Sequence, residues 1–411
     1  MNILFLSLDN YKTLNEHGIY TDLLRQFAAH NHNVYVISPI EKRLDENAGV
    51  LTEGRSKFIR VKIGNITKTN LLEKGISTLL IESQILKAIK RELSGVRFDL
   101  VLYPTPPITF YECVKYIKKR DGARTYLMLK DIFPQNAVDL GILSKHGLKG
   151  IIYRYFRRKE KKLYTISDRI GCMSQANIDY VINHNPDVDP KKVELCPNSI
   201  EIRDLRLSKE ESIEMRRKYN LPLEKRIFVY GGNLGRPQGI PFIIACLKAS
   251  KDIKEAFFLI VGNGTEYGKL ETYVREEKPD NVMLMRSLPK EEFDRMIAAC
   301  DVGLVFLDHR FTIPNFPSRL LSYMQAGLPV LAATDPNTDV GKVVVDGGFG
   351  WWCESRSTDD FLCSVKDICN RNLDGIPEFE MKYLKERYDV ANLYDVIIDK
   401  EKTQNNKSFV S

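Results

Sequence analysis

The sequence predicts an α/β protein built from two doubly wound parallel sheets. Short apolar runs alternate with amphipathic stretches over nearly the whole chain, which is the pattern of parallel strands connected by helices. The 411 residues, 43% of them hydrophobic, are enough for two domains of similar size. Ligands bind beyond the carboxyl ends of strands in such sheets, so two facing units would form a binding cleft between them.

Composition excludes several classes of protein. The net charge of +7 comes from 61 basic and 54 acidic residues, which is too modest to demand a nucleic-acid partner, and we expect none. The eight cysteines show no C-x-x-C pair, and the six histidines are too dispersed for a metal site, so we expect reduced thiols and no metal. The apolar run in MNILFLSLDNYKTL is too short for a signal or a membrane span and reads as a buried strand. We therefore expect a cytoplasmic protein.

The first domain is predicted to span residues 1–200. Its strands are short, apolar and separated by helical patterns. They are expected at Asn2–Leu8, Val34–Ser38, Phe58–Ile63, Leu100–Tyr103, Thr125–Leu129, Arg169–Met173 and Val193–Cys196.

A domain boundary is predicted near Pro197-Asn198-Ser199, where the pattern breaks and a charged stretch follows. The second domain, residues 201–376, restarts the alternation with RIFVYGG, AFFLIVG, NVMLM, DVGLVFL and LPVLAA as strands. Residues 377–411 read as a helical tail, and the polar end KTQNNKSFVS is expected to be disordered.

Two glycine-rich loops follow strands of the second domain. In VYGGNLGRPQG, glycines 231, 232 and 235 are candidate phosphate contacts, and Arg236 supplies charge. VGNGTEYGKLE, with Gly262 and Gly264, has the spacing G-x-G-x-x-x-G, which is one residue longer than the dinucleotide fingerprint G-x-G-x-x-G. Tight turns often use glycine for structural reasons alone. Two such loops in one domain nevertheless favour nucleotide binding.

The segment FTIPNFPSRLLSYMQAGLPVLAATD is the most specific in the chain. A helix is expected to begin at Pro317 and Ser318, with Arg319 in its first turn, and to end at Gly327. The Arg319 guanidinium and the free amides of the first turn would then point to one place, which suits a diphosphate leaving group. A solvated surface charge is an equally good interpretation of Arg319.

Taken in order, these motifs resemble the carboxyl-terminal domain of retaining family-4 glycosyltransferases, which have the GT-B fold and act in capsule, O-antigen and exopolysaccharide synthesis. RTYLMLKDIFPQNAVDLGIL resembles the R-D-x-W-P-E-S segment of the subgroup that includes L-fucosamine transferases. The resemblance implies metal-independent transfer with retention, without a cofactor. The donor would be a UDP-sugar, such as an N-acetylated or deoxy hexosamine, and the acceptor a saccharide or an undecaprenyl-diphosphate-linked sugar.

The resemblance also implies site residues. Asp131 ends a predicted strand and is expected to bind the acceptor hydroxyl, although it would equally serve as an N-cap for the helix after Pro134. His17 is interpreted as a loop histidine, because no orienting carboxylate is apparent. The predicted catalytic residues are Asp131, Arg236 and Arg319. The predicted donor contacts are Gly18, Gly232, Asn233, Gly235, Gly262, Gly264, Arg286, Asn315, Pro317, Ser318 and Ser322.

The chain departs from the family at four positions. Two glutamates that commonly contact the donor sugar and ribose are replaced by Pro314 and Ser322, and an Arg and a Lys of the first glycine loop by Asn233 and Gln238. Two alternatives therefore stay open: a catalytically silent binding subunit and a sugar-nucleotide 2-epimerase. A dehydrogenase is disfavoured because no G-x-G-x-x-G is followed by a ribose-binding acid.

Residues 145–164 predict an amphipathic basic helix. Leu148, Ile151, Ile152, Tyr155 and Phe156 share one stripe, and the Lys and Arg residues lie largely elsewhere. Such a helix would lie on the inner face of an anionic membrane, or it presents an ordinary solvated face. The Trp351-Trp352 pair is expected to pack between the tail and the core, and the turn at Pro104-Thr105-Pro106-Pro107 to be structural.

Overall fold

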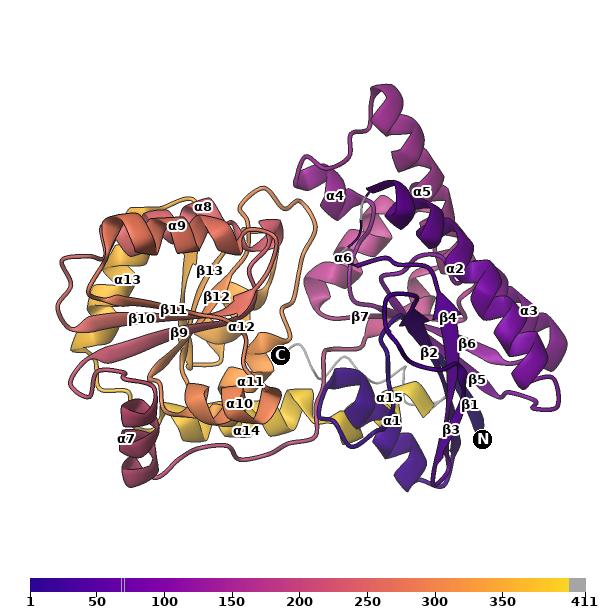
Figure 1. The fold of residues 1–411 in the computed structure, drawn as a ribbon, viewed down its shortest axis with the longest axis horizontal. Helices are drawn as coiled ribbons and strands as arrows, with labels where there is room; N and C mark the ends of the chain where they lie inside the picture. The colour runs from indigo at the N-terminus through magenta and orange to yellow at the C-terminus, as the bar shows by residue number, and fades with distance from the viewer. Residues whose placement is uncertain (68, 70, 399–411) are drawn as a thin grey trace. The chain divides into compact units, whose positions relative to one another are not determined.

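The computed structural model describes residues 1–67, 69 and 71–398. The predicted disordered end, KTQNNKSFVS, lies outside the described residues. The chain forms two compact units, of which the first comprises residues 1–201 and the segment from Val390, and the second Ile202–Asp389. Each is described by itself, with the labels of Figure 1.

The first unit contains an eight-stranded sheet in the order β3-β4-β2-β1-β5-β6-β7-β8. Every neighbouring pair is parallel except β3 with β4. In Figure 1, α2, α3 and α5 lie on one side of this sheet, and α1 and α15 on the other. The strands are β1 (Asn2–Leu6), β2 (Asn33–Glu41), β3 (Gly49–Glu53), β4 (Ser56–Ile63), β5 (Leu100–Thr105), β6 (Arg124–Leu129), β7 (Arg169–Cys172) and β8 (Val193–Leu195); the helices are α1 (Ile19–Ala29), α2 (Leu71–Glu92), α3 (Tyr111–Asp121), α4 (Gln135–Asp139), α5 (Gly147–Ile166), α6 (Gln175–His184) and α15 (Val390–Ile398).

The second unit contains a six-stranded parallel sheet in the order β11-β10-β9-β12-β13-β14. Figure 1 shows α8 and α9 on one side of it and α10, α11 and α14 on the other. The strands are β9 (Arg226–Asn233), β10 (Ala256–Asn263), β11 (Val282–Met285), β12 (Val302–Phe306), β13 (Val330–Thr334) and β14 (Gly350–Glu354); the helices are α7 (Lys209–Lys218), α8 (Ile240–Ala249), α9 (Tyr267–Glu277), α10 (Lys290–Ala298), α11 (Arg319–Ala326), α12 (Val340–Asp346), α13 (Thr358–Asn370) and α14 (Ile376–Tyr388).

The apolar runs of the sequence become the buried strands. All five residues of β12 and of β13 are buried, as expected for parallel strands covered by helices on both faces. Helix ends follow local chemistry: Ser208 and Glu211 form a capping box at the start of α7, and Gly327 ends α11 in the left-handed conformation, with φ +68°. The predicted α/β class with two parallel sheets is confirmed.

The C-terminal segment is divided between the two units. Helix α14 belongs to the second unit, whereas α15 returns to the first, where Leu393, Tyr394 and Ile397 join the core that contains Phe27. The described part of the predicted tail, residues 377–398, is therefore shared between two environments. The backbone N–H of Val390 donates to O of Ile200 at 3.0 Å, so the returning chain is bonded beside the point where it leaves the unit.

The tryptophan pair was expected to pack between the tail and the core, and Trp351 does pack against the core of the second unit. Both tryptophans lie in strand β14, which pairs with β13. Nε1 of Trp351 donates to Asp367 of α13 and Nε1 of Trp352 to Oγ1 of Thr334, both at 2.9 Å. The pair fixes the edge of the second sheet.

Candidate functional site

The candidate site lies at the carboxyl edge of the second sheet. Because β9, β10, β12 and β13 are parallel neighbours, the segments that follow them reach the same edge. These segments are the two glycine loops, the loop leading to α11, and the residues that follow β13.

The two glycine loops are in direct contact. Gly232 pairs with Gly262 in the sheet, and the N–H of Leu234 donates to O of Asn263 at 2.9 Å. A Cβ added to Gly262 would lie 1.9 Å from O of Gly232, and one added to Gly264 would lie 2.3 Å from O of Leu234. Glycine at 262 and 264 is thus required for the loops to approach each other.

Side chains already engage part of the first loop. The buried Gln238 accepts hydrogen bonds through Oε1 from the N–H of Gly235 and from Nδ2 of Asn233, both at 3.1 Å. The N–H of Gly231 donates to the hydroxyl of Tyr323, also at 3.1 Å. Gly232, Asn233 and Arg236 are the exposed residues of the loop, and Gly232 has a φ of +126° that residues with side chains rarely adopt.

Arg319 lies against the exposed Gly232. Its Nη1 donates to O of Gly231 at 3.0 Å, and its guanidinium lies 4.3 Å from the centre of the Tyr230 ring. The guanidinium carbon is 3.5 Å from the position of a Cβ on Gly232. The structure therefore brings together two residues that the sequence predicted separately, and it fixes the guanidinium by two kinds of contact.

The other two predicted arginines pair with residues at the start of α9. Arg236 is exposed, and its Nε is 3.9 Å from Oε1 of Glu266, at the start of α9. Arg286 lies over the ring of Tyr267 at 3.6 Å and forms an ion pair with Glu271 at 3.2 Å. Arg286 thus contacts residues of α9.

The segment before α11 presents small polar groups. Ser318 is exposed at the helix N-cap and makes no side-chain capping bond, Pro317 and Ser322 are half-buried, and Pro314 is buried. Asn315 accepts a hydrogen bond from Thr338 through its backbone oxygen. Its Nδ2 is buried and has no hydrogen-bond partner among the described residues.

Sequence reasoning missed two carboxylates at this edge. Asp308 follows β12, and its N–H donates to O of Pro237 at 2.9 Å. Burial opposes its ionisation, but hydrogen bonds from Arg310 hold its pKa below the usual value. Asp335 follows β13, and burial raises its pKa to about 6. Both are the first acids after an apolar strand, which is the signal that could have identified them.

In the first unit, Asp131 follows β6 and is half-buried. Its Oδ2 accepts from Nδ2 of Asn136 at 2.6 Å, whereas Oδ1 is buried and has no hydrogen-bond partner among the described residues. Helix α4 has Pro134 at its N-cap, so the N-cap role considered for Asp131 is not what the structure shows. Burial raises the pKa of Asp131 to about 6.

Gly18 and His17 belong to a polar cluster that the sequence did not reveal. The N–H of Gly18 donates to Oδ1 of Asp22 at 3.1 Å. Nδ1 of His17 lies 3.6 Å from Asp22 and 3.7 Å from Glu201, so the expectation of no nearby carboxylate is wrong. The Arg25 guanidinium bonds to all three side chains. Ligand atoms of these three side chains lie within 4.8 Å of one another, a spacing that fits a metal ion, but Arg25 already provides a cation there.

Helix α5 presents an apolar and basic face. Leu148 is 84% exposed, Ile151 57% and Ile152 47%. Glu160, the one acid of the helix, is buried and bonded to Arg157, so the exposed face of the helix carries no acidic residue. Within the described part of the chain, no helix combines the length and apolar character that a membrane span requires.

Comparison with known proteins places both units in glycosyltransferase families. Residues 19–204 match the model of Glycosyltransferase Family 4, and residues 211–381 match that of Glycosyl transferases group 1. The probable glycosyltransferase WbjE of Pseudomonas aeruginosa is 26% identical over 333 residues, 80% of each chain. The putative colanic acid biosynthesis glycosyl transferase WcaI of Escherichia coli K12 is 23% identical over 249 residues, 60% of each chain.

A solved structure shows the same architecture. The Anabaena protein Alr3699/HepE, in complex with UDP-glucose, superposes with a TM-score of 0.68 at 14% identity, over 97% of this chain and 98% of its own. The chain thus carries a family-4 glycosyltransferase domain followed by a group-1 glycosyl transferase domain, and its two parallel sheets have the GT-B fold.

Proposed function

We propose that the chain transfers a sugar from a nucleoside-diphosphate donor to a saccharide or undecaprenyl-diphosphate-linked acceptor in surface polysaccharide synthesis. The observation that carries the proposal is the Arg319 guanidinium, held by Gly231 and Tyr230 beside the exposed Gly232. Cleavage at the sugar carbon places negative charge on the β-phosphate, and a guanidinium already fixed in place stabilises that charge without reorganising.

The chemistry of the donor is proposed from two sources. UDP is the expected nucleotide, since HepE was solved with UDP-glucose. Resemblance to the family supports an N-acetylated or deoxy hexosamine, transfer with retention and independence of metal ions. A role in polysaccharide synthesis is supported by the name of WcaI, which refers to colanic acid.

We propose that Asp131 binds the acceptor hydroxyl. With a pKa of about 6, its carboxylate is mostly ionised at neutral pH, and Asn136 orients one of its oxygens. Oδ1 retains its hydrogen-bonding capacity for a donor such as a sugar hydroxyl. Asp308 and Asp335 are the carboxylates of the second unit that would hold donor hydroxyls in place of the family glutamates, which are absent at Pro314 and Ser322.

A donor panel tests the proposal. Calorimetry with UDP- and GDP-sugars should show binding of one donor, and product analysis with a lipid-linked acceptor should show nucleotide release in step with glycosylation. The same turnover in EDTA would support metal independence. Interconversion of the donor sugar without an acceptor would instead identify a 2-epimerase.

The second candidate is a catalytically silent binding subunit. The absence of carboxylates at 314 and 322 favours it. So does Gln238, an uncharged side chain that replaces the family lysine and accepts a hydrogen bond from the N–H of Gly235 in the first glycine loop. Tight donor binding without turnover, with every acceptor offered, would select this candidate over the enzyme.

We also propose that α5 contacts an anionic membrane surface, where a lipid-linked acceptor would be found. Flotation with vesicles containing phosphatidylglycerol should recover the protein, and Leu148→Asp combined with Ile152→Asp should abolish recovery. Leu79→Asp is the matched control, because Leu79 is also exposed, at 60%, but lies on α2. Equal loss in the control would exclude a specific role for α5.

A further inference from the structure

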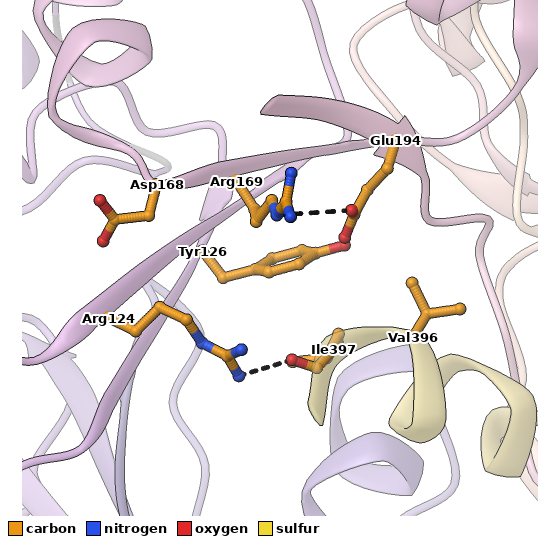
Figure 2. A pocket seen from close by; sticks show the side chains of 7 residues that line it. All are labelled: Arg124, Tyr126, Asp168, Arg169, Glu194, Val396 and Ile397. Atoms are coloured by element: carbon orange, nitrogen blue, oxygen red, sulfur yellow. Dashed lines mark hydrogen bonds and ion pairs between the residues drawn. The ribbon is translucent and has the colours of Figure 1, made fainter. Parts of the chain in front are cut away.

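The charged side chains that line a cavity in the first unit already have partners. The cavity has a volume of about 330 Å³, and the end of α15 forms part of its wall (Figure 2). Arg124 donates to O of Ile397 at 2.6 Å, and Arg169 pairs with Glu194 at 3.8 Å. Asp168 pairs with a lysine of α3 at 2.7 Å. These contacts attach α15 to the sheet, and they account for the polar lining of the cavity without a ligand.

In the second unit, two neighbouring strands separate at the carboxyl edge of the sheet. The pairing of β9 with β12 ends at Val229 and Gly303, although β9 continues to Asn233 and β12 to Phe306. Strand β9 lies between β10 and β12, so the strand order reverses its direction here. Such a point is where parallel α/β sheets bind their ligands. The groups that join β9 to β12 beyond the last pair therefore bear on the candidate site.

The hydroxyl of Tyr323 joins the two strands beyond that pair. It accepts a hydrogen bond from the N–H of Gly231 in β9 and donates one to O of Leu304 in β12, both at 3.1 Å. Tyr323 is fully buried, and burial raises its pKa, so the hydroxyl is protonated and can make both bonds. A Cβ on Gly303 would overlap the Tyr323 ring, so this glycine gives the ring its place. The hydroxyl thus substitutes for a direct bond between the strands.

Tyr323 and Arg319 hold the same residue from one face of α11. Their positions are one helical turn apart, so their side chains project in the same direction. Arg319 donates through Nη1 to O of Gly231 at 3.0 Å, whereas Tyr323 accepts from the N–H of Gly231. Both backbone polar groups of Gly231 are therefore bonded to α11. This arrangement fixes the start of the exposed segment at Gly232 relative to the guanidinium.

We propose that Tyr323 is a positioning residue for the diphosphate of the donor, because its hydroxyl sets the place of Gly231 and thereby of the Arg319 guanidinium beside Gly232. The inference rests on the proposed function, in which Arg319 stabilises the charge of the β-phosphate. A donor group that is fixed before the ligand arrives stabilises charge without reorganising, and a small displacement weakens it. Without the hydroxyl, β9 loses its bond to β12 at this point, and the carbonyl that holds Arg319 is free to shift.

A structural interpretation competes with this proposal. Tyr323 would then only satisfy two buried backbone groups of the core, those of Gly231 and Leu304. Both interpretations predict that Tyr323→Phe lowers stability, because the N–H of Gly231 loses its acceptor. They differ in their dependence on Arg319. An effect on ligand binding that passes through the guanidinium disappears once the guanidinium is absent, whereas an independent effect adds to its loss.

Calorimetric titration of the full chain with UDP and, in parallel, with GDP tests the proposal. It compares the parent, Tyr323→Phe, Arg319→Ala and the double variant. We expect one nucleotide to bind the parent, Arg319→Ala to weaken its affinity at least about tenfold, and Tyr323→Phe to weaken it about fivefold to tenfold. In the Arg319→Ala background, Tyr323→Phe should change the affinity by less than about twofold. The control is Tyr273→Phe, which removes the hydroxyl of a buried tyrosine on α9 and should leave the affinity unchanged.

The outcomes separate this inference from the proposed function. Affinity in Tyr323→Phe equal to that of the parent, or an equal loss with and without Arg319, would overturn the positioning role alone. Unchanged affinity in Arg319→Ala, or binding of neither nucleotide to the parent, would overturn the proposed function and this inference with it. Tyr323→Phe removes one oxygen atom and keeps the ring against Gly303, so we expect it to fold. Thermal unfolding followed by circular dichroism checks this, and all titrations are run below the lowest melting temperature.

Discussion

Arg319 can be tested separately from the loop that holds it. Its two contacts, with the Gly231 carbonyl and the Tyr230 ring, position the guanidinium before the reaction, whereas the negative charge on the leaving group develops only in the transition state. Arg319→Ala should therefore lower kcat by roughly a hundredfold to a thousandfold with a much smaller change in KM. Arg319→Lys should recover only part of the rate, because an ammonium lacks the planar fork.

The control for Arg319 is Arg356→Gln, which removes an exposed arginine of the same unit that pairs with Glu354. Steady-state kinetics with the accepted donor gives the comparison, and calorimetry with UDP shows whether binding survives. Full turnover in Arg319→Ala would exclude the leaving-group role.

Asp131 should make the protein less stable at neutral pH than in acid. Its folded pKa of about 6 lies above the ordinary value of 3.8, so the folded state keeps a proton that the unfolded state releases between about pH 4 and 6. Stability from this group is complete below pH 4 and is lost as pH rises through 6. The ionised, buried carboxylate then costs about 1–3 kcal/mol.

Asp131→Asn should remove that cost. The variant should exceed the parent in unfolding free energy at pH 8 by about 1–3 kcal/mol and match it near pH 4. Its kcat/KM should fall by about a hundredfold if the carboxylate accepts the acceptor proton. Urea unfolding at the two pH values and initial rates at pH 8 provide the measurements. A variant that is fully active would show that the carboxylate has no part in the reaction.

Residues near one another in sequence were easier to predict than distant pairs. Gly232 and Arg319 were both identified, each from its own local pattern, but their contact joins positions far apart in the chain. The contact of Glu201 with Arg25 was missed for the same reason, since the two residues are 176 positions apart. Local spacing shows which groups a site contains, and only the fold shows which groups meet.

At the scale of elements, most of the strands that were predicted are buried apolar runs, and the edge strands β8 and β11, which are only partly buried, were predicted as well. Strand β3 was missed because four of its five residues are exposed and it pairs antiparallel at the sheet edge, so no apolar pattern distinguishes it. Strand β14 was missed because its tryptophans were assigned to packing against the tail. In both cases the sheet edge lacks the two-sided burial that gives a parallel strand its pattern.

The two glycine loops pack against each other through their backbone atoms. Gly262→Ala would place a Cβ 1.9 Å from O of Gly232, and the backbone cannot move aside without breaking the pairing of β9 with β10. We expect a loss of about 2–4 kcal/mol in the unfolding of the second unit. Gly268→Ala is the matched control, because its Cβ would meet nothing within 4 Å at the start of α9, and it should be neutral or stabilise by up to about 1 kcal/mol.

Urea unfolding followed by tryptophan fluorescence measures this difference. Both tryptophans of the chain, Trp351 and Trp352, lie in the second unit, so their signal reports that unit. Equal stability of the two variants would mean that the loops do not approach as closely as the structure shows.

For the whole molecule, the sequence predicted two domains of similar size but not which domain the last helix joins. Helix α15 is amphipathic, and its apolar face would fit any exposed apolar groove. The structure places Tyr394 5.2 Å from the Phe27 ring and 4.1 Å from the His30 ring, and its hydroxyl 2.9 Å from Nε2 of His32. These contacts are specific to α1 and to the turn that connects it to β2, and amphipathicity alone does not encode them.

Because α15 belongs to the first unit, a substitution that undocks this helix should lower the stability of the first unit and leave that of the second unchanged. Leu393→Asp buries a charge where the side chain is 3% exposed, and we expect it to lower the melting temperature of the first unit by several degrees. Far-ultraviolet circular dichroism follows both units, whereas the fluorescence of Trp351 and Trp352 follows the second alone. The dichroism should therefore show an early transition that the fluorescence does not, and Asn392→Asp on the same helix, at an exposed position, is the control. A parallel shift of both signals would mean that α15 stabilises the two units as one cooperative structure, because only then would damage in the first unit reach the tryptophans of the second.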